Sequence, residues 1–263
     1  MIVEISWLQL SLVSIFILVL LAISLYESLK LEKSILIGSF RTIAQLILVG
    51  YLIKAIFLNA EWYYVLPILV IMLLLASQTL IKRLKNPIRG TYIYALIAVS
   101  ITSILTLIAI FTLIVNIPRW YDPQYLIPIA GMVIANGMNG ATLAGERYKS
   151  ELFLRLAEME MLLSLGYNSR RASQTSRKQA LIAALIPSIN NMMVMGIVHL
   201  PGMMTGQILS GVMPDEAVKY QIVIVLSLTA AVSLTSWIFL NLLDKKFFTP
   251  NHQIRYDLIN PSK

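Results

Sequence analysis

The sequence contains no cysteine and few residues that carry charge. Among its 263 residues, only two are histidine and 13% are charged. The absence of cysteine excludes disulfide frameworks, thiolate zinc sites, iron–sulfur clusters and cysteine nucleophiles. His199 and His252 lie far apart, and neither has the histidine four residues away that a helical zinc site requires. No glycine is followed by lysine, so the phosphate-binding loop G-x-x-x-x-G-K-[ST] is absent from the chain.

Apolar residues dominate the composition. They make up 58% of the chain, with a mean hydropathy of +0.77, whereas soluble domains are about 45–50% apolar. A water-soluble fold of this size could not bury so much apolar surface, so we expect an integral membrane protein. Several runs with at most one strong charge reach the roughly 20 residues that a spanning helix needs. These runs are 7–26, 35–53, 62–81, 90–118, 123–145 and 220–243.

A seventh apolar stretch, 179–213, is too long for one simple span. Pro187, Pro201, Gly202 and Gly206 interrupt it. We expect a helix to about Leu200, followed by an irregular re-entrant or extracytoplasmic piece. The prediction is an all-α fold with about seven transmembrane helices, six or eight being alternatives, in a single transmembrane domain over residues 1–263.

Basic residues are distributed unevenly among the predicted loops. With the N-terminus outside, all but Arg41, Lys54, Arg119 and Lys219 of the 21 lysines and arginines fall in or beside cytoplasmic segments. Such an asymmetry is typical of the positive-inside rule. It predicts a multi-pass protein of the plasma (inner) membrane with a cytoplasmic C-terminus. It also explains the net charge of +8, so a nucleic-acid partner has no support.

The only sizeable soluble segment is 146–178. Leu152, Leu156, Met159 and Leu163 recur at helical spacing, which predicts an amphipathic helix. Gly166 suits the left-handed residue that ends such a helix, and Asn168 or Ser169 can cap a second helix that begins at Arg170. Glu151 also precedes Arg155 by four residues, a favourable ion-pair orientation. We therefore predict a cytoplasmic helix–turn–helix between spans five and six, of a size suited to docking a partner; an ordinary solvated hairpin is the alternative.

One charge, Arg41, falls well inside a predicted span, with Gln45 on the same helical face. Because an arginine facing lipid is costly, both side chains should face protein or water. The pair is either a polar clamp between helices, with Arg41 reaching the cytoplasmic interface, or part of a substrate path or gate. No aspartate or glutamate lies inside the predicted spans, which disfavours an ion-coupled carrier.

Two segments, 128–140 and 187–206, are rich in glycine, asparagine and methionine. Small residues let helices approach closely, and asparagine amides can bond across the interface. Methionines fill irregular cores or ligate soft metals. A helix broken by proline and glycine at membrane depth must line protein or a cavity, so 187–206 is the best candidate for a pathway or gate. The candidate pathway or gate residues, besides Arg41 and Gln45, are Asn136, Asn139, Pro187, Asn190, Pro201 and Gly202.

Several short motifs together resemble the Fet-type iron-export ABC permease family, which includes plant aluminium-tolerance permeases. The likeness runs from about residue 30 to 245, and its most specific piece is Leu200-Pro-Gly-Met-Met-Thr-Gly206. The other pieces are Arg41-Thr-Ile-Ala-Gln45, Val49-Gly-Tyr51, Pro128-Ile-Ala-Gly-Met132, Leu163-Ser-Leu-Gly166, Ala184-Leu-Ile-Pro187 and Lys219-Tyr-Gln221.

The resemblance implies a permease subunit, working as a homodimer with a separate ABC-type ATP-binding subunit, that exports iron or a similar metal by alternating access. This chain would then be no enzyme and bind no cofactor, because the partner uses the ATP. Residues implied to dock the partner are Glu160, Leu163, Gly166, Tyr167, Arg170 and Arg171. Residues suggested to contact metal are Met203 and Met204, which belong to the family pattern, and His199, which does not.

Two alternatives from other classes remain open. An autonomous channel or ion-coupled carrier for a small solute would need neither ATP nor a second polypeptide. A membrane scaffold would transport nothing and would use the cytoplasmic hairpin to recruit a regulator.

Overall fold

The computed structural model describes residues 6–59, 61–84, 88–115 and 119–259. These residues form helices and connecting turns, with two isolated β-bridges and no longer strand among them. Contacts divide the chain into two units, 1–61 and 62–263, and the helices of each unit are described separately. The all-α prediction is confirmed.

The first unit is a helical hairpin made of α1 (Trp7–Ser11), α2 (Ser14–Tyr26) and α3 (Glu32–Asn59). The turn between α2 and α3 is tied by Ser24, whose hydroxyl donates to Glu32 Oε1 at 2.7 Å and accepts the Leu31 N–H at 3.2 Å. Within the hydropathic window of α3, no side chain is buried. Arg41 and Gln45 are both exposed on this helix.

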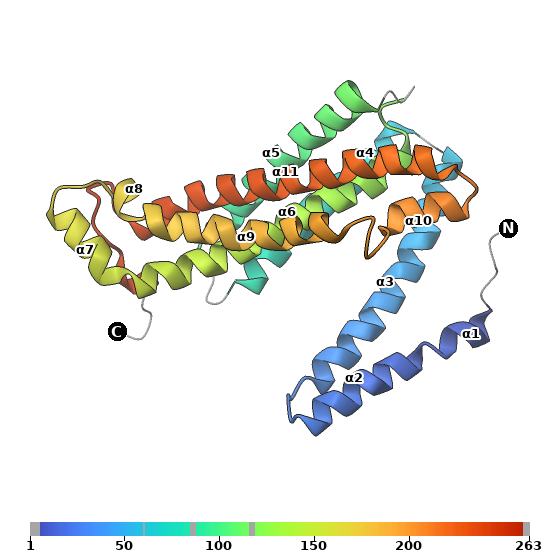
Figure 1. Cartoon of the computed structure of the whole chain (residues 1–263), viewed down its shortest axis with the longest axis horizontal. Coiled ribbons are helices and arrows are strands. Elements are labelled where there is room, and N and C mark those ends of the chain that lie inside the picture. The colour runs from blue at the N-terminus through green and yellow to red at the C-terminus, as the bar shows by residue number, and fades with distance from the viewer. Residues whose placement is uncertain (1–5, 60, 85–87, 116–118, 260–263) are drawn as a thin grey trace. The chain divides into compact units, whose positions relative to one another are not determined.

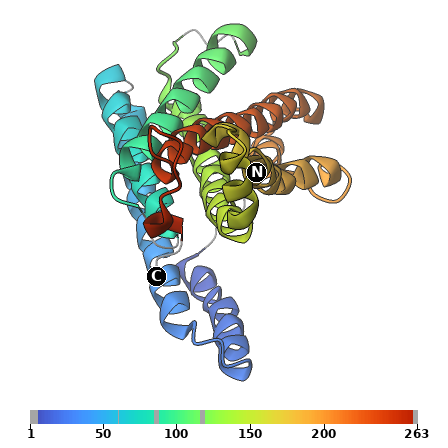
Figure 2. The same ribbon diagram turned by 90° about the vertical axis from the view of Figure 1, so that its left-hand side faces the viewer.

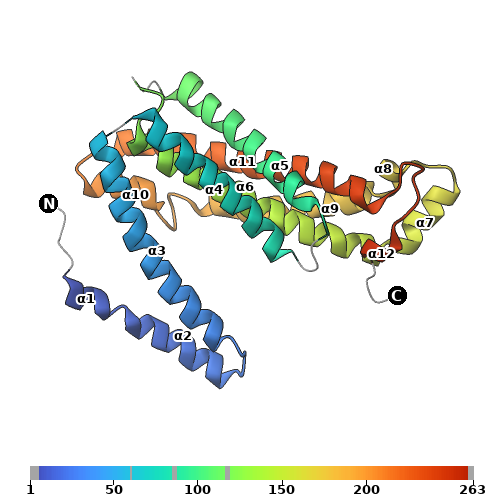
Figure 3. The same ribbon diagram turned by 180° about the vertical axis from the view of Figure 1, so that it is seen from behind.

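The second unit is a bundle of long helices that surrounds α6 (Pro123–Leu154). Its other long helices are α4 (Trp62–Arg83), α5 (Thr91–Ile108) with the π-helix η1 (Ala109–Ile114), α9 (Gln174–Val194) and α11 (Pro214–Phe247). The helix α6 packs against α4, α5, α9 and α11 (Figures 1 and 3), and it is the most buried of the apolar helices.

Glycines bring α6 and α11 into close contact, as the small residues of 128–140 predict. A β-carbon built at Gly137 would lie 2.6 Å from Thr235 Oγ1, and one at Gly140 would lie 2.6 Å from Val232 Cγ1. Real β-carbons do not make contacts this short, so only glycine permits this separation of the two helices.

Six of the described helical stretches are long and apolar enough to cross a membrane: Leu8–Tyr26, Glu32–Phe57, Trp62–Arg83, Thr91–Ile114, Pro123–Leu154 and Pro214–Phe247. The seventh predicted span corresponds to α9, which lies alongside α6 and α11 but is less apolar. The count of seven therefore stays a prediction.

Two predicted boundaries differ from the structure. The helix predicted to reach about Leu200 ends at Val194, and a turn through Gly196, at φ +82°, leads to α10 (Gly202–Leu209). The first part of the soluble segment predicted at 146–178 is instead the continuation of α6 as far as Leu154, because no helix-breaking residue follows Gly145. The chain bends at Arg155, and α7 (Leu156–Ser164) then begins.

Candidate docking site

The turn after α7 is held by the residues that the sequence predicts. Gly166 has φ +85°, its N–H donates to the Leu163 carbonyl at 3.0 Å, and the Tyr167 N–H donates to the Leu162 carbonyl at 3.1 Å. This pair of bonds is a Schellman motif. Asn168 then caps α8 (Ser169–Ala172), since its side chain accepts the Arg171 N–H at 2.9 Å. The sharp turn and the cap are therefore confirmed.

Ion pairs fix the bend between α6 and α7. Arg155 donates to Glu151 Oε2 at 2.9 Å and to Glu158 Oε2 at 3.0 Å, and Glu151 also pairs with Arg147. Hydrogen bonds from Arg155 to Glu151, and then to Glu158, raise the pKa of the Arg155 guanidinium. Glu151 is itself buried, so its two arginine partners compensate for its desolvation.

The C-terminal segment completes a groove beside this turn. After α11, residues 248–255 fold back in a turn that leads to α12 (Tyr256–Ile259), at the end of the second unit that faces the viewer in Figure 2. The groove has a volume of about 830 Å³. It is lined by Glu160, Leu163, Gly166, Tyr167, Asn251, His252, Gln253, Ile254 and Tyr256.

Two side-chain contacts hold the C-terminal segment against the hairpin. The Tyr256 hydroxyl donates to Glu160 Oε1 at 2.8 Å, and this bond raises the pKa of Tyr256. The Ser169 N–H donates to His252 Nδ1 at 3.3 Å, with Ser169 Oγ 2.9 Å from the same nitrogen. The structure thus brings four predicted docking residues, Glu160, Leu163, Gly166 and Tyr167, into one groove.

The hairpin exposes apolar side chains outside the spanning helices, in the groove and beyond it. Tyr167, which lines the groove, is 48% exposed. Met161 and Leu165, elsewhere on the hairpin, are 56% and 67% exposed, and Arg170 and Arg171 are exposed as well. Lipid cannot account for this exposure if the hairpin lies outside the bilayer. Exposed apolar side chains with a polar rim are typical of a protein-binding surface.

A second face of the hairpin is anchored in the core, and Leu163 at its edge also lines the groove. Leu152 and Met159 are fully buried, and Leu156 and Leu163 pack against the same cluster, so the predicted stripe faces inward. Beneath it, the Tyr148 hydroxyl donates to Asp244, and Arg177 NH1 lies 3.8 Å from Asp244 Oδ2. This network joins α6, α9 and α11 directly below the hairpin.

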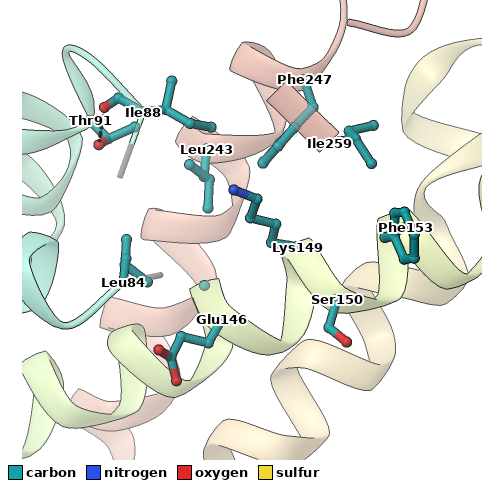
Figure 4. Close-up of a pocket in the computed structure, with 11 residues that line it drawn as sticks. Leu84, Ile88, Thr91, Glu146, Lys149, Ser150, Phe153, Leu243, Phe247 and Ile259 are labelled. Carbon is teal, nitrogen blue, oxygen red and sulfur yellow. Dashed lines mark hydrogen bonds between the residues drawn. The ribbon is translucent and has the colours of Figure 1, made fainter. Parts of the chain in front are cut away.

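A second cavity, of about 350 Å³, lies between α6, α11 and the α4–α5 connection. In Figure 4 the Lys149 ammonium points toward Leu243, and the Glu146 carboxylate points away from it. Apolar side chains, among them Ile88, Phe247 and Ile259, form most of the wall.

The candidate pathway residues of the second unit have different surroundings. Arg83 NH1 donates to Asn139 Oδ1 at 2.7 Å, whereas Asn136 donates to the Met132 carbonyl of its own helix at 2.8 Å. Pro187 and Asn190 are exposed on α9. Pro201 and Gly202 begin α10, as the irregular piece predicted there requires.

The three candidate metal-contact residues also have different surroundings. Met204 is buried against a cavity between α9, α10 and α11, Met203 packs in the apolar cluster around Ile224, and the His199 side chain is exposed. Within the described residues, no group of three or more histidine, cysteine, aspartate or glutamate side chains could hold a metal ion. Metal contact by these residues stays a prediction.

Sequence reasoning missed two parts of this region. The first is the C-terminal segment 248–259, whose polar sequence gives no sign that it folds back on the hairpin. The second is the burial of two carboxylates, Glu151 and Asp244, which lie in α6 and α11 because these helices run past the predicted spans. The predicted ion pair of Glu151 with Arg155 is confirmed. The predicted span ends at Leu243 because charged residues follow it, whereas α11 continues to Phe247.

These helices and the comparisons with known proteins define a multi-pass α-helical membrane protein. Residues 7–248 match the Uncharacterised protein family (UPF0014), and the chain belongs to this family. It is 36% identical over 250 residues to UPF0014 membrane protein YjkA of Bacillus subtilis. The aligned region covers 95% of this chain and 98% of that protein. No solved structure gives a significant match.

Two further relatives carry names that refer to function. The chain is 34% identical over 246 residues to Probable iron export permease protein FetB of Escherichia coli, covering 94% of this chain and 93% of that protein. It is 30% identical over 241 residues to Protein ALUMINUM SENSITIVE 3 of Arabidopsis thaliana, covering 91% and 87%. The resemblance to this family is therefore confirmed.

Proposed function

We propose that this protein is the membrane-spanning subunit of an ATP-driven exporter of iron or a similar metal ion. The observation that carries the proposal is the similarity, along nearly the whole chain, to a relative named as a probable iron export permease. The absence of a phosphate-binding loop from the sequence supports a separate ATP-binding subunit as the motor.

The groove beside the Gly166 turn is the proposed docking site for that subunit. Its exposed Tyr167 offers an apolar anchor, and the hairpin around it exposes the apolar Met161 and Leu165 and the charged Arg170 and Arg171. Aromatic and arginine side chains are the residue types that contribute most at protein interfaces. The inward stripe and the Tyr148–Asp244–Arg177 network would carry movement of the docked subunit to α6, α9 and α11.

The remaining parts of the proposal concern the assembly. Two permease chains would form a homodimer in the plasma membrane, with the N-terminus outside and the groove and C-terminus in the cytoplasm. The exposed α2 and α3 of the first unit are available for lipid or for a second copy. Helices around the broken segment between α9 and α10 would rock to give alternating access.

Transport in sealed vesicles tests the proposal. The full chain and its ATP-binding partner are reconstituted together, and Fe²⁺ movement is followed with and without ATP. The proposal predicts movement that requires ATP and both polypeptides, and ATP hydrolysis that Fe²⁺ stimulates. Movement by this chain alone without ATP would instead support a channel or carrier.

A further inference from the structure

A second groove, the α9–α11 groove, lies between two neighbouring helices of the bundle. These helices run side by side in Figure 1, and the groove between them has a volume of about 330 Å³. On each helix the lining residues recur every three or four positions and so share one face. The residues from α9 are Gln174, Arg177, Lys178, Leu181, Ile182 and Leu185. Those from α11 are Trp237, Leu240 and Asn241.

Two contacts fix the register of the two antiparallel helices. Arg177 NH1 lies 3.8 Å from Asp244 Oδ2, and Met192 Sδ lies 3.1 Å from Thr229 Oγ1. Fifteen residues separate these contacts along α9, and fifteen also separate them along α11. The helices therefore run alongside each other without a slip, so the level of each lining residue follows from its position in the sequence.

Basic side chains collect at one end of the α9–α11 groove, where the apolar run 220–243 of α11 ends. Arg177 and Lys178 lie at this end, close to the level of Asp244. Arg171 lies beside them, because it donates to Gln174 Oε1 at 2.7 Å. The helix α9 contains no acidic residue, so positive charge is in excess at this end. Lys178 is exposed, and its ammonium group can reach a ligand in the groove.

The other end of the groove is apolar and open to its surroundings. Trp237 is 51% exposed and Ile182 39%, and Leu185 lies near the level of Trp237. From Arg177 to Leu185 the distance along α9 is about 12 Å, which is most of one leaflet of a hydrocarbon core about 30 Å thick. Tryptophan is enriched near the headgroup level of a bilayer. The groove therefore runs from the membrane surface into one leaflet.

The two ends together indicate what the α9–α11 groove accepts. A water-soluble solute would leave the apolar end uncovered, and a neutral lipid would bring no counter-charge to the basic end. A second copy of this chain that met the groove by two-fold symmetry would bring the same basic residues against it. An anionic lipid presents a negative headgroup and an acyl chain in the order in which the groove presents their partners.

We propose that the α9–α11 groove binds one anionic phospholipid of the adjoining leaflet. The phosphate pairs with Lys178 and Arg177, and an acyl chain lies along Ile182, Leu185 and Trp237. The proposal requires that the chain crosses the membrane, but it depends neither on ATP nor on the exported cargo.

Quenching of Trp237 by brominated lipids tests the proposal. The full chain, with its other three tryptophans replaced by phenylalanine, is placed in phosphatidylcholine vesicles. A small fraction of the lipid carries bromine on its acyl chains and is either phosphatidylglycerol or phosphatidylcholine. We expect brominated phosphatidylglycerol to associate with Trp237 about fivefold more strongly or better, the effect of one basic residue near an anionic headgroup. Equal quenching, or quenching by neither lipid because protein covers Trp237, would overturn the proposal.

Matched charge variants locate the headgroup. Lys178→Gln should bring the preference for phosphatidylglycerol close to one. Lys245→Gln is the control, because Lys245 is exposed on α11 near the same level but does not line the groove. A preference that falls equally in both variants would show attraction to the whole basic surface and would overturn the assignment to this groove.

A second measurement uses the chain with all four tryptophans. The purified protein is mixed in detergent with equal amounts of phosphatidylglycerol and phosphatidylcholine, and bound lipid is counted by native mass spectrometry. We expect one retained phosphatidylglycerol per chain, present in Lys245→Gln and lost in Lys178→Gln. Retention of both lipids alike, or of phosphatidylglycerol in Lys178→Gln, would contradict the proposed site.

Discussion

At the scale of single residues, Gly166 has a left-handed backbone conformation in the proposed docking site. Its φ of +85° is a conformation that costs a residue with a β-carbon about 1–2 kcal/mol. No atom outside the turn lies within 4 Å of where that β-carbon would be. A substitution there would therefore alter the turn without disturbing the packing around it.

Gly166→Val should uncouple ATP hydrolysis from transport while the protein still folds into the membrane. The strained residue would shift Tyr167 and open the groove, so the partner would bind or move the helices less well. Gly38→Val is the control, since Gly38 has ordinary φ and open surroundings. Transport per ATP hydrolysed, measured in vesicles, should fall in the first variant only. Unchanged coupling in Gly166→Val would contradict the docking assignment.

The Tyr148–Asp244–Arg177 network should show an asymmetry between its members. Tyr148→Phe removes one hydrogen bond and should lower the stability by about 1–3 kcal/mol. Asp244→Ala should cost more, because it leaves the mostly buried Arg177 without its carboxylate. Thermal unfolding of the detergent-solubilised variants measures both changes. Equal losses of stability in the two variants would mean that the ion pair between Arg177 and Asp244 contributes little to the stability of the fold.

The contact between Tyr256 and Glu160 should depend on pH. The hydrogen bond to Glu160 raises the pKa of Tyr256 above its ordinary 10.0. Since the folded-state pKa is raised, the contact stabilises the protein below pH 10.0 and is lost as the pH rises through the folded-state value. Ultraviolet difference spectra between the protein and Tyr256→Phe should show this tyrosine ionising later than a free one. Glu160→Gln should lower its pKa toward the ordinary value.

Local sequence predicted the turn residues because their chemistry is local. Gly166 and Asn168 act through bonds to neighbours a few positions away, and the pattern around them specifies both roles. Tyr256 and His252 meet Glu160 and Ser169 across more than eighty residues, and no local pattern indicates such a contact. Asp244 likewise became visible only when the packing of three helices was known.

At the scale of elements, the contact between α6 and α11 determines the bundle. Periodicity and apolar length predicted most helices, including α6 and α11, although both extend beyond the predicted spans. The end of α9 was harder to predict, because Met195 and Gly196 continue an apolar run while the backbone already turns. Helix ends without proline or a polar cap leave little signal in the sequence.

Gly140→Val should destabilise the bundle by roughly 1–3 kcal/mol or more, because the added side chain collides with Val232. Gly131→Ala is the control in the same helix, since its β-carbon would meet only the flexible end of Met72 at 3.2 Å. Midpoints of thermal unfolding in detergent should therefore fall for Gly140→Val and change little for Gly131→Ala. Similar midpoints for both variants would show that α6 and α11 can separate without cost.

At the scale of the whole molecule, the chain leaves much of its surface for others to cover. The apolar helices of the first unit are nearly all exposed, and the groove beside the Gly166 turn exposes apolar side chains outside the spans. In the proposed assembly, lipid and a second permease chain would cover the helices of the first unit, and an ATP-binding subunit would cover the groove. The composition alone predicted a membrane protein, but it could not indicate which surface faces which neighbour.

Purification from the native membrane in a mild detergent, followed by identification of every stoichiometric partner by mass spectrometry, tests this central claim. The account predicts an ATP-binding subunit with a phosphate-binding loop, at about one copy per permease chain, and its loss when Tyr167 and Leu165 are replaced by aspartate. A protein that purifies alone from several detergents, with solute flux that persists without ATP, would contradict it.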